Sequence, residues 1–339
     1  TDGRICLGHR RLSIIDLSDA AAQPMASAGG LVHIVFNGEI YNYSDLRKEL
    51  LSQGHSFQTT SDTEVMLKLY ELEGDLFVNR LKGMFAFAIF DELRNKLLLG
   101  RDPFGIKPLY YADNGSCIQF ASQVKALVAG GQVDTTPDPA AQAGFFLWGN
   151  IPEPRTLYQG IRSLEPGRLM TVRESSAPET VVFSRPLDSL KKDHGKVADS
   201  TLTLQHIVAD SISRHMVADV PVGAFLSAGI DSASICALAM ETGLREPLRT
   251  VTLGFEEYRD SSRDEVPLAR EIAALFGTSH QVRYVRGRDF QNALADILHS
   301  MDQPTIDGVN TWFVSKVTAE TGLKVDPSGE GGDEFFRGY

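Results

Sequence analysis

Two glycine-rich segments that lie far apart in the sequence have the residue types that phosphate binding requires. The first is Leu-Ser-Ala-Gly-Ile-Asp-Ser at 226–232, and the second is Ser-Gly-Glu-Gly-Gly-Asp-Glu at 328–334. Each follows an apolar stretch, 220–226 or 323–325, that predicts a buried strand. Glycine and serine let a backbone approach a ligand closely, and N–H groups at the start of a helix bind anions. We therefore interpret the two segments as two halves of one phosphate site.

The carboxylate of Asp231 lies inside the first of these segments, where a bound phosphate would repel it. A cation between the two groups removes that repulsion, so the segment predicts Mg²⁺ together with a polyphosphate. Asp333 offers a second carboxylate from the other segment. We expect Ser232 to cap a helix that continues through the apolar run 233–240. A plain strand-to-helix turn without a ligand is the alternative interpretation of 226–232 taken alone.

Composition limits the classes of protein to which the chain can belong. Its 339 residues are enough for two hydrophobic cores. The net charge of −11 disfavours a nucleic-acid surface, and no apolar run is long enough to cross a membrane. The amino-terminal residues do not have the pattern of a signal peptide. Because Cys6, Cys117 and Cys236 lack metal-ligand spacing, we expect reduced, mostly buried thiols in a cytoplasmic protein.

Residues 1–185 predict an α+β domain of stacked, mainly antiparallel sheets, because short strand-like runs follow one another without long crossover helices. The expected strands are 32–36, 85–90, 96–99, 109–111 and 118–121. Two helices are expected at 45–53 and 63–71, and Ser61 with Asp62 is placed to cap the second.

A polar stretch without periodicity at 186–200 predicts a linker. From 201 to 339 helices and strands alternate, which predicts a doubly wound α/β domain with a parallel sheet. The expected helices are 204–216, 264–276 and 309–321, and the expected strands between them are 249–253 and 281–285. Ligands bind such sheets at the carboxyl ends of the strands, and both glycine-rich segments follow such ends.

Several motifs carry a family resemblance. The segment at 226–232 resembles the pyrophosphate-binding loop of ATP pyrophosphatases, usually written S-G-G-x-D-S, with Ala228 in place of one glycine. Five further blocks resemble the glutaminase domain of glutamine-hydrolysing asparagine synthetases, namely Gly8-His-Arg-Arg-Leu-Ser-Ile-Ile-Asp16, Phe36-Asn-Gly-Glu-Ile-Tyr-Asn42, Ser61-Asp-Thr-Glu64, Gly83-Met-Phe-Ala-Phe-Ala88 and Arg101-Asp-Pro-Phe-Gly-Ile-Lys-Pro-Leu-Tyr110. The resemblance runs from end to end and implies an Ntn-hydrolase-like glutaminase domain followed by a domain of the ATP-pyrophosphatase type.

The activity that this resemblance implies is the amidation of aspartate. Glutamine would be hydrolysed in the first domain, and ATP would adenylate the aspartate side chain in the second domain before ammonia displaces AMP. The resemblance therefore implies ATP and Mg²⁺ as cofactors and glutamine, aspartate and ATP as small-molecule substrates. It is compatible with a homodimer.

In the first domain, the resemblance assigns glutamine binding to charged side chains and to backbone groups. Arg11 would pair with the α-carboxylate, and Glu39 and Asp62 would receive the α-ammonium group. Asn37 and Gly38 would form the oxyanion hole. The complete set that would bind glutamine is Arg11, Leu12, Ser13, Ile14, Ile15, Asn37, Gly38, Glu39 and Asp62, with a strand expected over 12–15.

Each of these residues also has an interpretation without a ligand. Arg11 could form a solvated pair with Arg10, and Asp62 could serve only as a helix cap. Glu39 could belong to a hairpin turn, because Asn-Gly is a common turn dipeptide.

In the second domain, the resemblance assigns nucleotide, metal and catalytic roles to the two glycine-rich segments and one neighbouring strand. The backbones of Leu226, Leu253, Ser328 and Gly329 would contact the nucleotide. Pyrophosphate and its metal would be held by Ser227, Gly229, Asp231 and Ser232. Asp333 would complete the Mg²⁺ site, and Glu330 would assist formation or amination of the β-aspartyl-AMP intermediate.

Besides Ala228, two departures from the family pattern lie at the ends of the chain. The family's nucleophile is an amino-terminal cysteine that precedes the first residue here, and neither Cys6 nor Thr1 is placed to replace it. The family also continues past Tyr339 to a lysine that pairs with phosphate. We therefore expect this chain to lack glutaminase activity, to show little or no synthetase activity and to retain at most residual Mg-ATP binding. An amidotransferase with another carboxylate acceptor and a non-catalytic nucleotide-binding relative are the alternatives.

Overall fold

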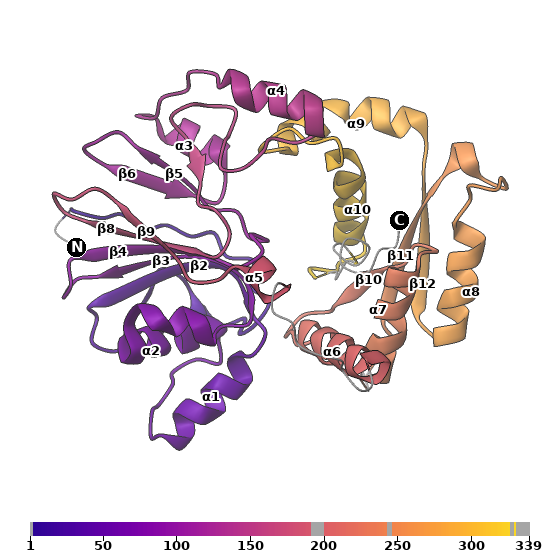
Figure 1. Cartoon of the computed structure of the whole chain (residues 1–339). Helices are drawn as coiled ribbons and strands as arrows, with labels where there is room; N and C mark the ends of the chain where they lie inside the picture. The colour runs from indigo at the N-terminus through magenta and orange to yellow at the C-terminus, as the bar shows by residue number, and fades with distance from the viewer. Residues whose placement is uncertain (1–2, 191–199, 243–245, 326–328, 330–339) are drawn as a thin grey trace. The chain divides into compact units, whose positions relative to one another are not determined.

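The chain folds into two compact units (Figure 1), as described by a computed structural model that covers residues 3–190, 200–242, 246–325 and 329. The first unit contains Thr1–Gly195 together with the short segment Asp302–Ile306. The second contains Lys196–Met301 and Asp307–Tyr339. The segment 302–306 therefore belongs to the first unit although its neighbours in sequence belong to the second.

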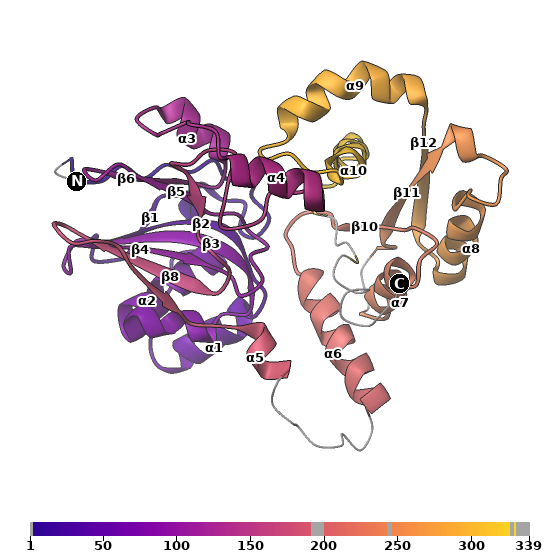
Figure 2. The same ribbon diagram turned by 45° about the horizontal axis from the view of Figure 1, so that its top comes forward.

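The first unit contains two sheets, and every pairing within them is antiparallel (Figure 2). The six-stranded sheet has the order β1-β2-β3-β4-β8-β9. Its strands are β1 (Met25–Ala26), β2 (Val32–Ile40), β3 (Gly83–Asp91), β4 (Lys96–Arg101), β8 (Arg168–Arg173) and β9 (Glu179–Val182). The three-stranded sheet has the order β6-β5-β7 and consists of β6 (Ile118–Ala121), β5 (Tyr110–Asp113) and β7 (Arg162–Ser163).

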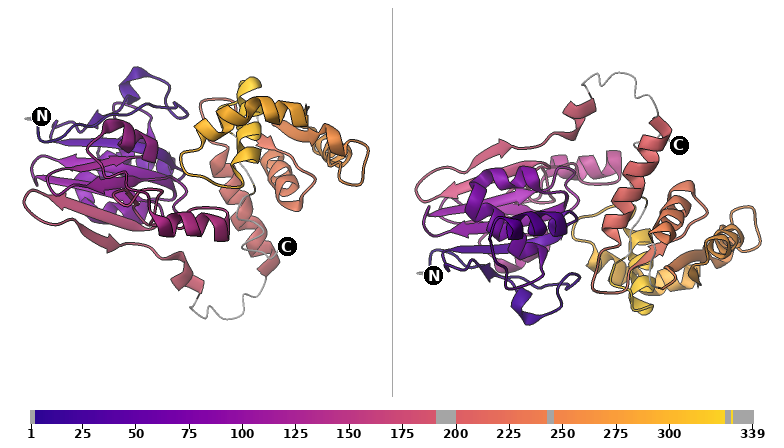
Figure 3. Two further views of the ribbon diagram at one scale, coloured as in Figure 1. Left: turned by 90° about the horizontal axis from the view of Figure 1, so that it is seen from above. Right: turned by 90° about the horizontal axis from the view of Figure 1, so that it is seen from below.

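Helices cover the outer faces of this pair of sheets. In the right panel of Figure 3, the indigo-to-purple helices α1 and α2 lie over the six-stranded sheet, and α3 packs on β5 of the other sheet. A separate apolar cluster that includes Val35, Leu99, Leu109 and Met170 fills the space between the sheets. The helical elements are η1 (Asp19–Ala21), α1 (Tyr43–Ser52), α2 (Asp62–Glu73), η2 (Gly74–Arg80), α3 (Val124–Gly130), α4 (Pro139–Trp148) and α5 (Pro186–Leu190). The first unit is thus the layered α+β fold that its strand pattern predicts.

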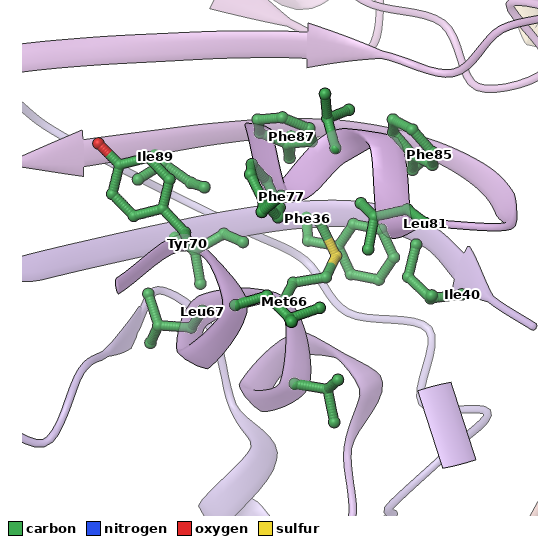
Figure 4. Close-up of a cluster of buried hydrophobic side chains, with 14 of the residues drawn as sticks. Phe36, Ile40, Met66, Leu67, Tyr70, Phe77, Leu81, Phe85, Phe87 and Ile89 are labelled. Atoms are coloured by element: carbon green, nitrogen blue, oxygen red, sulfur yellow. The ribbon is translucent and has the colours of Figure 1, made fainter. Parts of the chain in front are cut away.

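An aromatic core joins α2 to β3 (Figure 4). The rings of Tyr70 and Phe77 meet edge to face with centroids 5.7 Å apart, and Phe77 and Phe87 lie 5.4 Å apart. Such aromatic pairs stabilise a core beyond the area they bury.

Helix α2 begins after a capping residue, Ser61, whose hydroxyl accepts a hydrogen bond from Glu64 N at 3.3 Å. The cap expected at Ser61 is confirmed.

The second unit contains a parallel sheet with the order β10-β11-β12 and helices on both faces (Figure 1). The strands are β10 (Gly223–Phe225), β11 (Arg249–Phe255) and β12 (Ser279–Val285). Helices α6, α7 and α8 share one apolar cluster with β10, whereas α9 and α10 share another with β11 and β12. The helical elements are α6 (Ser200–His215), α7 (Ile230–Glu241), η3 (Glu256–Tyr258), α8 (Val266–Phe276), α9 (Gly287–Ser300) and α10 (Gly308–Glu320).

A fourth segment pairs with the free side of β10. Val325 forms a parallel bridge to Val222, and Gly223 N donates to Val325 O at 3.0 Å. A Cβ added to Gly223 would lie 2.3 Å from Leu323 Cδ1 and 3.0 Å from Arg249 O, so the Leu323 side chain packs directly over this glycine. The chain thus runs outward from β10 to β12 and then returns to the other side of β10. The reversal makes the gap between β10 and Val325 the topological switch point, where ligands of such sheets bind.

Three sequence expectations are wrong. No strand forms over 12–15, because that segment forms a loop whose Ile15 and Asp16 carbonyls accept hydrogen bonds from the Arg11 guanidinium. Cys6 and Cys117 are exposed, and only Cys236 is buried. Helix α7 is capped by Gly229 and not by Ser232, because the helix begins a turn earlier than expected.

The aromatic core should dominate the stability of the first unit. Replacing Phe87, which is 2% exposed, with Ala is expected to cost about 3–5 kcal/mol of unfolding free energy because it leaves a cavity. The matched control is Phe146→Ala on α4, which removes the same atoms from a side chain that is 85% exposed and should change stability by less than about 0.5 kcal/mol. Urea unfolding followed by circular dichroism measures both. Equal effects of the two substitutions would contradict the core assignment.

Candidate functional site

Two buried carboxylates lie side by side at one end of β2. Glu39 is in β2, and Asp62 is the first residue of α2. Asp62 Oδ2 accepts a hydrogen bond from Ile40 N at 3.1 Å, which ties the start of α2 to the strand residue after Glu39. The two residues are 6% and 5% exposed. Among the described residues Glu39 Oε1 has no hydrogen-bond partner, so it is placed to accept one from a ligand.

Burial controls the charge of this pair. It raises the pKa of Glu39 to about 7, and the negative charge of Asp62 adds to the rise while the Lys107 ammonium group opposes it. Burial likewise raises the pKa of Asp62 to about 6, against the lowering effects of its backbone hydrogen bonds and of Arg11. A ligand that brings a positive charge and N–H donors would favour the ionised form of both carboxyls.

The backbones of β2 and β3 come unusually close beside Glu39. A Cβ added to Gly38 would lie 2.1 Å from Met84 O, and one added to Gly83 would lie 2.1 Å from Glu39 O. Neither position therefore accepts a side chain without moving a strand. Asn37 and Gly38 lie within β2, so the hairpin-turn interpretation of this block is wrong.

The Arg11 side chain organises the loop that faces Asp62. Its two terminal nitrogens donate to Asp16 O at 2.8 Å and to Ile15 O at 2.5 Å. Asp16 Oδ2 accepts from Thr60 N at 2.7 Å, which links this loop to the residues before α2. The hydrogen bonds of Asp16, first of all from the Ser18 hydroxyl, lower its pKa to about 2. A guanidinium has five N–H donors, so Arg11 keeps donors for a ligand.

The other predicted residues of this loop differ in exposure. Leu12 is 62% exposed, Ser13 and Ile14 are half-buried, and Ile15 is buried. The Ile15 carbonyl accepts a hydrogen bond from the Arg11 side chain. Among the recorded side-chain interactions of the described residues, none connects Leu12 with Glu39 or Asp62.

Lys107 is a member of this charged cluster that sequence analysis missed. It lies in the block 101–110 that carried part of the resemblance, but nothing in its spacing relates it to Glu39. The connection arises only through the fold, because Asp102 Oδ2 accepts hydrogen bonds from both Lys107 N and Phe85 N.

The glycine-rich turn of the second unit lies at the carboxyl end of β10. Leu226 N donates to Val251 O at 3.0 Å, and the Leu226 carbonyl accepts from the Thr252 hydroxyl. The Leu226 N–H is therefore used in the pairing with β11, whereas its carbonyl oxygen has a second lone pair beyond the one that accepts from Thr252. Leu253 lies in β11, half-buried.

Hydrogen bonds within the turn hold its shape. The Ser232 hydroxyl lies 2.9 Å from Ser227 O and 3.1 Å from Gly229 O, and Gly229 N donates to Ser227 Oγ at 3.2 Å. Gly229 caps α7 without a side-chain acceptor. The N–H groups of the first turn of α7 are therefore not satisfied by a cap, which is the arrangement that binds phosphate in other folds.

The two glycine-rich segments meet at Asp231. A Cβ added to Gly329 would lie 2.7 Å from Asp231 Cβ, so the backbone of the second segment lies directly against this side chain. Ser328, Glu330 and Asp333 lie outside the described residues, and their predicted roles stay predictions. Among the residues that are described, no group of three or more His, Cys, Asp or Glu side chains could hold a metal ion.

None of the helices in the described part of the chain is both long enough and apolar enough to cross a membrane.

Comparison with known proteins agrees with this architecture. The family model of the glutamine amidotransferase domain matches residues 1–182, and that of asparagine synthase matches residues 203–339. The asparagine synthetase [glutamine-hydrolyzing] 1 of Bacillus subtilis is 37% identical over 100% of this chain and 52% of its own length. The putative asparagine synthetase [glutamine-hydrolyzing] 2 of Methanocaldococcus jannaschii is 32% identical over 99% of this chain and 67% of its own length.

A solved structure, the glutamine phosphoribosylpyrophosphate amidotransferase of B. subtilis complexed with ADP and GMP, is 18% identical. The match covers 90% of this chain and 72% of that one with a TM-score of 0.35, a likeness too slight to support an argument.

The two family matches define a glutamine amidotransferase domain joined to an asparagine synthase domain. The chain belongs to the family of glutamine-hydrolysing asparagine synthetases. It spans about half the length of several of these curated relatives, at 52% and 56% of the two B. subtilis enzymes numbered 1 and 3.

The raised pKa of Glu39 predicts a pH dependence of stability. Its ordinary value is 4.5 and its value in the folded protein is about 7. The protonated side chain therefore contributes stability that is fully present below pH 4.5 and is lost as the pH rises through about 7. Glu39→Gln has the shape of the protonated side chain and cannot ionise, so it should avoid that loss. The unfolding free energy of the variant minus that of the parent should therefore be about 1–3 kcal/mol larger at pH 8 than at pH 4.5.

Urea unfolding at the two pH values measures this difference. The control is Glu179→Gln in β9, whose side chain is 73% exposed and should leave the pH dependence unchanged. If Glu39→Gln keeps the pH dependence of the parent, then Glu39 does not titrate abnormally.

Proposed function

We propose that this chain carries the glutamine-binding and ATP-binding parts of an enzyme that converts aspartate to asparagine. Ammonia from glutamine would be transferred to aspartate activated as β-aspartyl-AMP, with glutamate, AMP and pyrophosphate as the other products. The single observation that best supports the proposal is the contact of Gly329 with Asp231, because it joins the two segments that the nucleotide site requires.

In the second unit, the proposed nucleotide site lies at the switch point beside β10. The first N–H groups of α7 and the hydroxyls of Ser227 and Ser232 would hold the phosphates. Asp231 is half-buried at this turn, and a carboxylate is a fitting ligand for Mg²⁺, which prefers oxygen. Asp231 and Asp333 would hold Mg²⁺ and so offset the charge of the phosphates, while Glu330 would act on the acyl-adenylate.

In the first unit, the carboxylate pair and Arg11 suit the two charges of an amino acid. Arg11 would bind the α-carboxylate of glutamine with the donors that its loop does not use. Glu39 and Asp62 would accept the α-ammonium, which would also give Glu39 Oε1 the hydrogen-bond partner that it lacks among the described residues. Asn37 and Gly38 would stabilise the oxyanion that forms at the amide carbon. The nucleophile itself is not among these residues.

The proposed role of Asp231 is tested by nucleotide affinity. Asp231→Asn should weaken binding of ATP in Mg²⁺ by about ten-fold or more, because a charge-assisted metal ligand is lost. Isothermal titration calorimetry with and without Mg²⁺ measures this, and the difference between the two conditions should shrink in the variant. The matched control is Glu241→Gln at the other end of α7, which removes the same charge from an exposed position. An unchanged Mg²⁺ dependence in Asp231→Asn would reject the site.

The proposed role of Glu39 is tested by a pair of ligands that differ only in the α-amino group. Glu39→Gln should weaken binding of L-glutamine by about ten-fold, because a buried charged hydrogen bond is lost. Glutaramate, which lacks the amino group, should bind parent and variant alike. If both ligands lose the same affinity, then Glu39 does not contact the ammonium.

The acceptor is tested in the protein as it occurs in the cell by ATP–pyrophosphate exchange. Exchange that requires aspartate would support adenylation of that side chain. Exchange with another carboxylate and none with aspartate would overturn this part of the proposal.

A further inference from the structure

A cavity in the second unit lies beside the edge strand β12, between α9 and α10. Its volume is about 280 Å³, which is near the lower limit for pockets that hold small molecules. Its lining comes from the carboxyl end of β12 and from the two helices, all of which belong to the second unit. None of the described residues assigned above to nucleotide or metal lines it. The cavity is therefore separate from the glycine-rich turn.

Each of the two helices presents one side to this cavity. Helix α9 contributes positions 289, 292, 293 and 296, and α10 contributes positions 313, 316, 317 and 320. Residues three and four apart lie on the same side of a helix, so each set forms a continuous stripe. The buried part of the lining is apolar and consists of Val285, Ala293, Phe313 and Val317. Helix packing thus fixes both the apolar base of the cavity and the polar positions around it.

Some of the polar side chains around the cavity are engaged in local contacts. Arg283 and Glu320 form an ion pair at 3.8 Å between side chains that are 61% and 45% exposed, and such a pair contributes little stability. Asp289 Oδ2 accepts a hydrogen bond from Arg286 N at 2.9 Å, which closes the first turn of α9. Asp289 is therefore used by its own helix, whereas the ion pair is weak enough to rearrange around a ligand.

Three other polar side chains of the lining form no hydrogen bond or ion pair with any of the described residues, namely Asn292, Asp296 and Lys316. Lys316 lies over the ring of Trp312, with its Nζ 4.9 Å from the ring centroid. Lys316 and Asp296 have opposite charges and line one cavity, yet they do not pair with each other. The space between them suits a molecule that brings a negative group to the lysine and a positive group to the aspartate.

The charges of the lining disfavour other classes of ligand. A polyphosphate would meet three carboxylates against two cations. A metal ion needs oxygen ligands that converge, and in the described part of the chain no group of three or more His, Cys, Asp or Glu side chains could hold one. A hydrocarbon would cover the charged groups without giving them partners. A small zwitterion provides partners of both signs, and its side chain can contact the apolar base.

We propose that this cavity is a binding site for a free α-amino acid with a short side chain, in which Lys316 pairs with the α-carboxylate and Asp296 with the α-ammonium group. Arg283 is the second cation of the lining and is available to join Lys316 on the carboxylate. The Asn292 amide can both donate to and accept from an amide on the ligand. The cavity and the sites of the proposed function share no residue, so either can fail without the other.

Binding is measured by NMR on the whole protein labelled with ¹⁵N at tryptophan, because the Trp312 indole lies beside Lys316. Trp312→Phe identifies its signal. L-asparagine at millimolar concentration should shift this signal in a saturable way. Succinamate, which lacks the α-ammonium group, and 3-aminopropanamide, which lacks the α-carboxylate, should each bind at least about ten-fold more weakly. No saturable shift with L-asparagine, or equal affinity for all three compounds, would overturn the proposal.

Substitutions at the two charged positions test the assigned pairs. Lys316→Met and Asp296→Asn should each weaken L-asparagine binding by about ten-fold, and Lys316→Arg should keep an affinity close to that of the parent. The matched controls are Lys324→Met and Glu271→Gln, which remove the same charges from exposed positions outside the cavity. Circular dichroism confirms that each variant is folded.

Equal affinity of L-asparagine for the parent, Lys316→Met and Asp296→Asn would place the ligand at another site and overturn the proposal. Binding of ATP in Mg²⁺, measured by calorimetry, should be the same in the parent and in all of these variants. Loss of L-asparagine binding together with ATP binding would indicate a damaged fold and would also count against the cavity as a separate site.

Discussion

The parallel pairing of Val325 with β10 is the contact on which the second unit's site depends. Val325 forms a parallel bridge to Val222, and Gly223 N donates a hydrogen bond to Val325 O at 3.0 Å. Because the two segments are parallel, the chain leaves both at the same edge of the sheet. This is why Gly329 reaches Asp231 although most of the second unit separates them in sequence. An antiparallel pairing would have sent the two glycine-rich segments to opposite edges.

In the first unit, the main physical constraint is the burial of two carboxyl groups away from water. Glu39 and Asp62 would each be more stable in solvent, and burial raises the pKa of both. The surrounding structure offsets this cost only in part, through the Ile40 N–H bond to Asp62 and the cations Arg11 and Lys107. The pair therefore favours protonation near neutral pH, and in the proposed function the ammonium group of an amino acid would favour its ionised form. The close approach of β2 and β3 at Gly38 and Gly83 leaves no room for a side chain at either position beside Glu39.

The elements that could be predicted from sequence are those with strong local periodicity. The helix at 63–71 and the strand at 118–121 appear where expected, with bounds Asp62–Glu73 and Ile118–Ala121, because hydrophobic spacing and the Ser61 cap are local signals. The start of α7 could not be placed, because Gly229 caps it without a side-chain hydrogen bond and leaves no local signal. The strand that the resemblance implies over 12–15 is instead a loop, because its shape is set by hydrogen bonds from the Arg11 guanidinium to the Ile15 and Asp16 carbonyls.

What the sequence by itself determined is the family, the fold class of each unit and most of the polar residues that the proposed sites use, since these follow from residue types, local spacing and motif order. The tertiary structure decided which of those residues meet. It brought Gly329 to Asp231, paired Glu39 with Asp62, added Lys107 to that pair and assigned Asp302–Ile306 to the first unit. The physical reason is that strand pairing and the burial of charge act between residues far apart in the chain. A local sequence pattern does not specify which distant backbone or charged group a residue will contact.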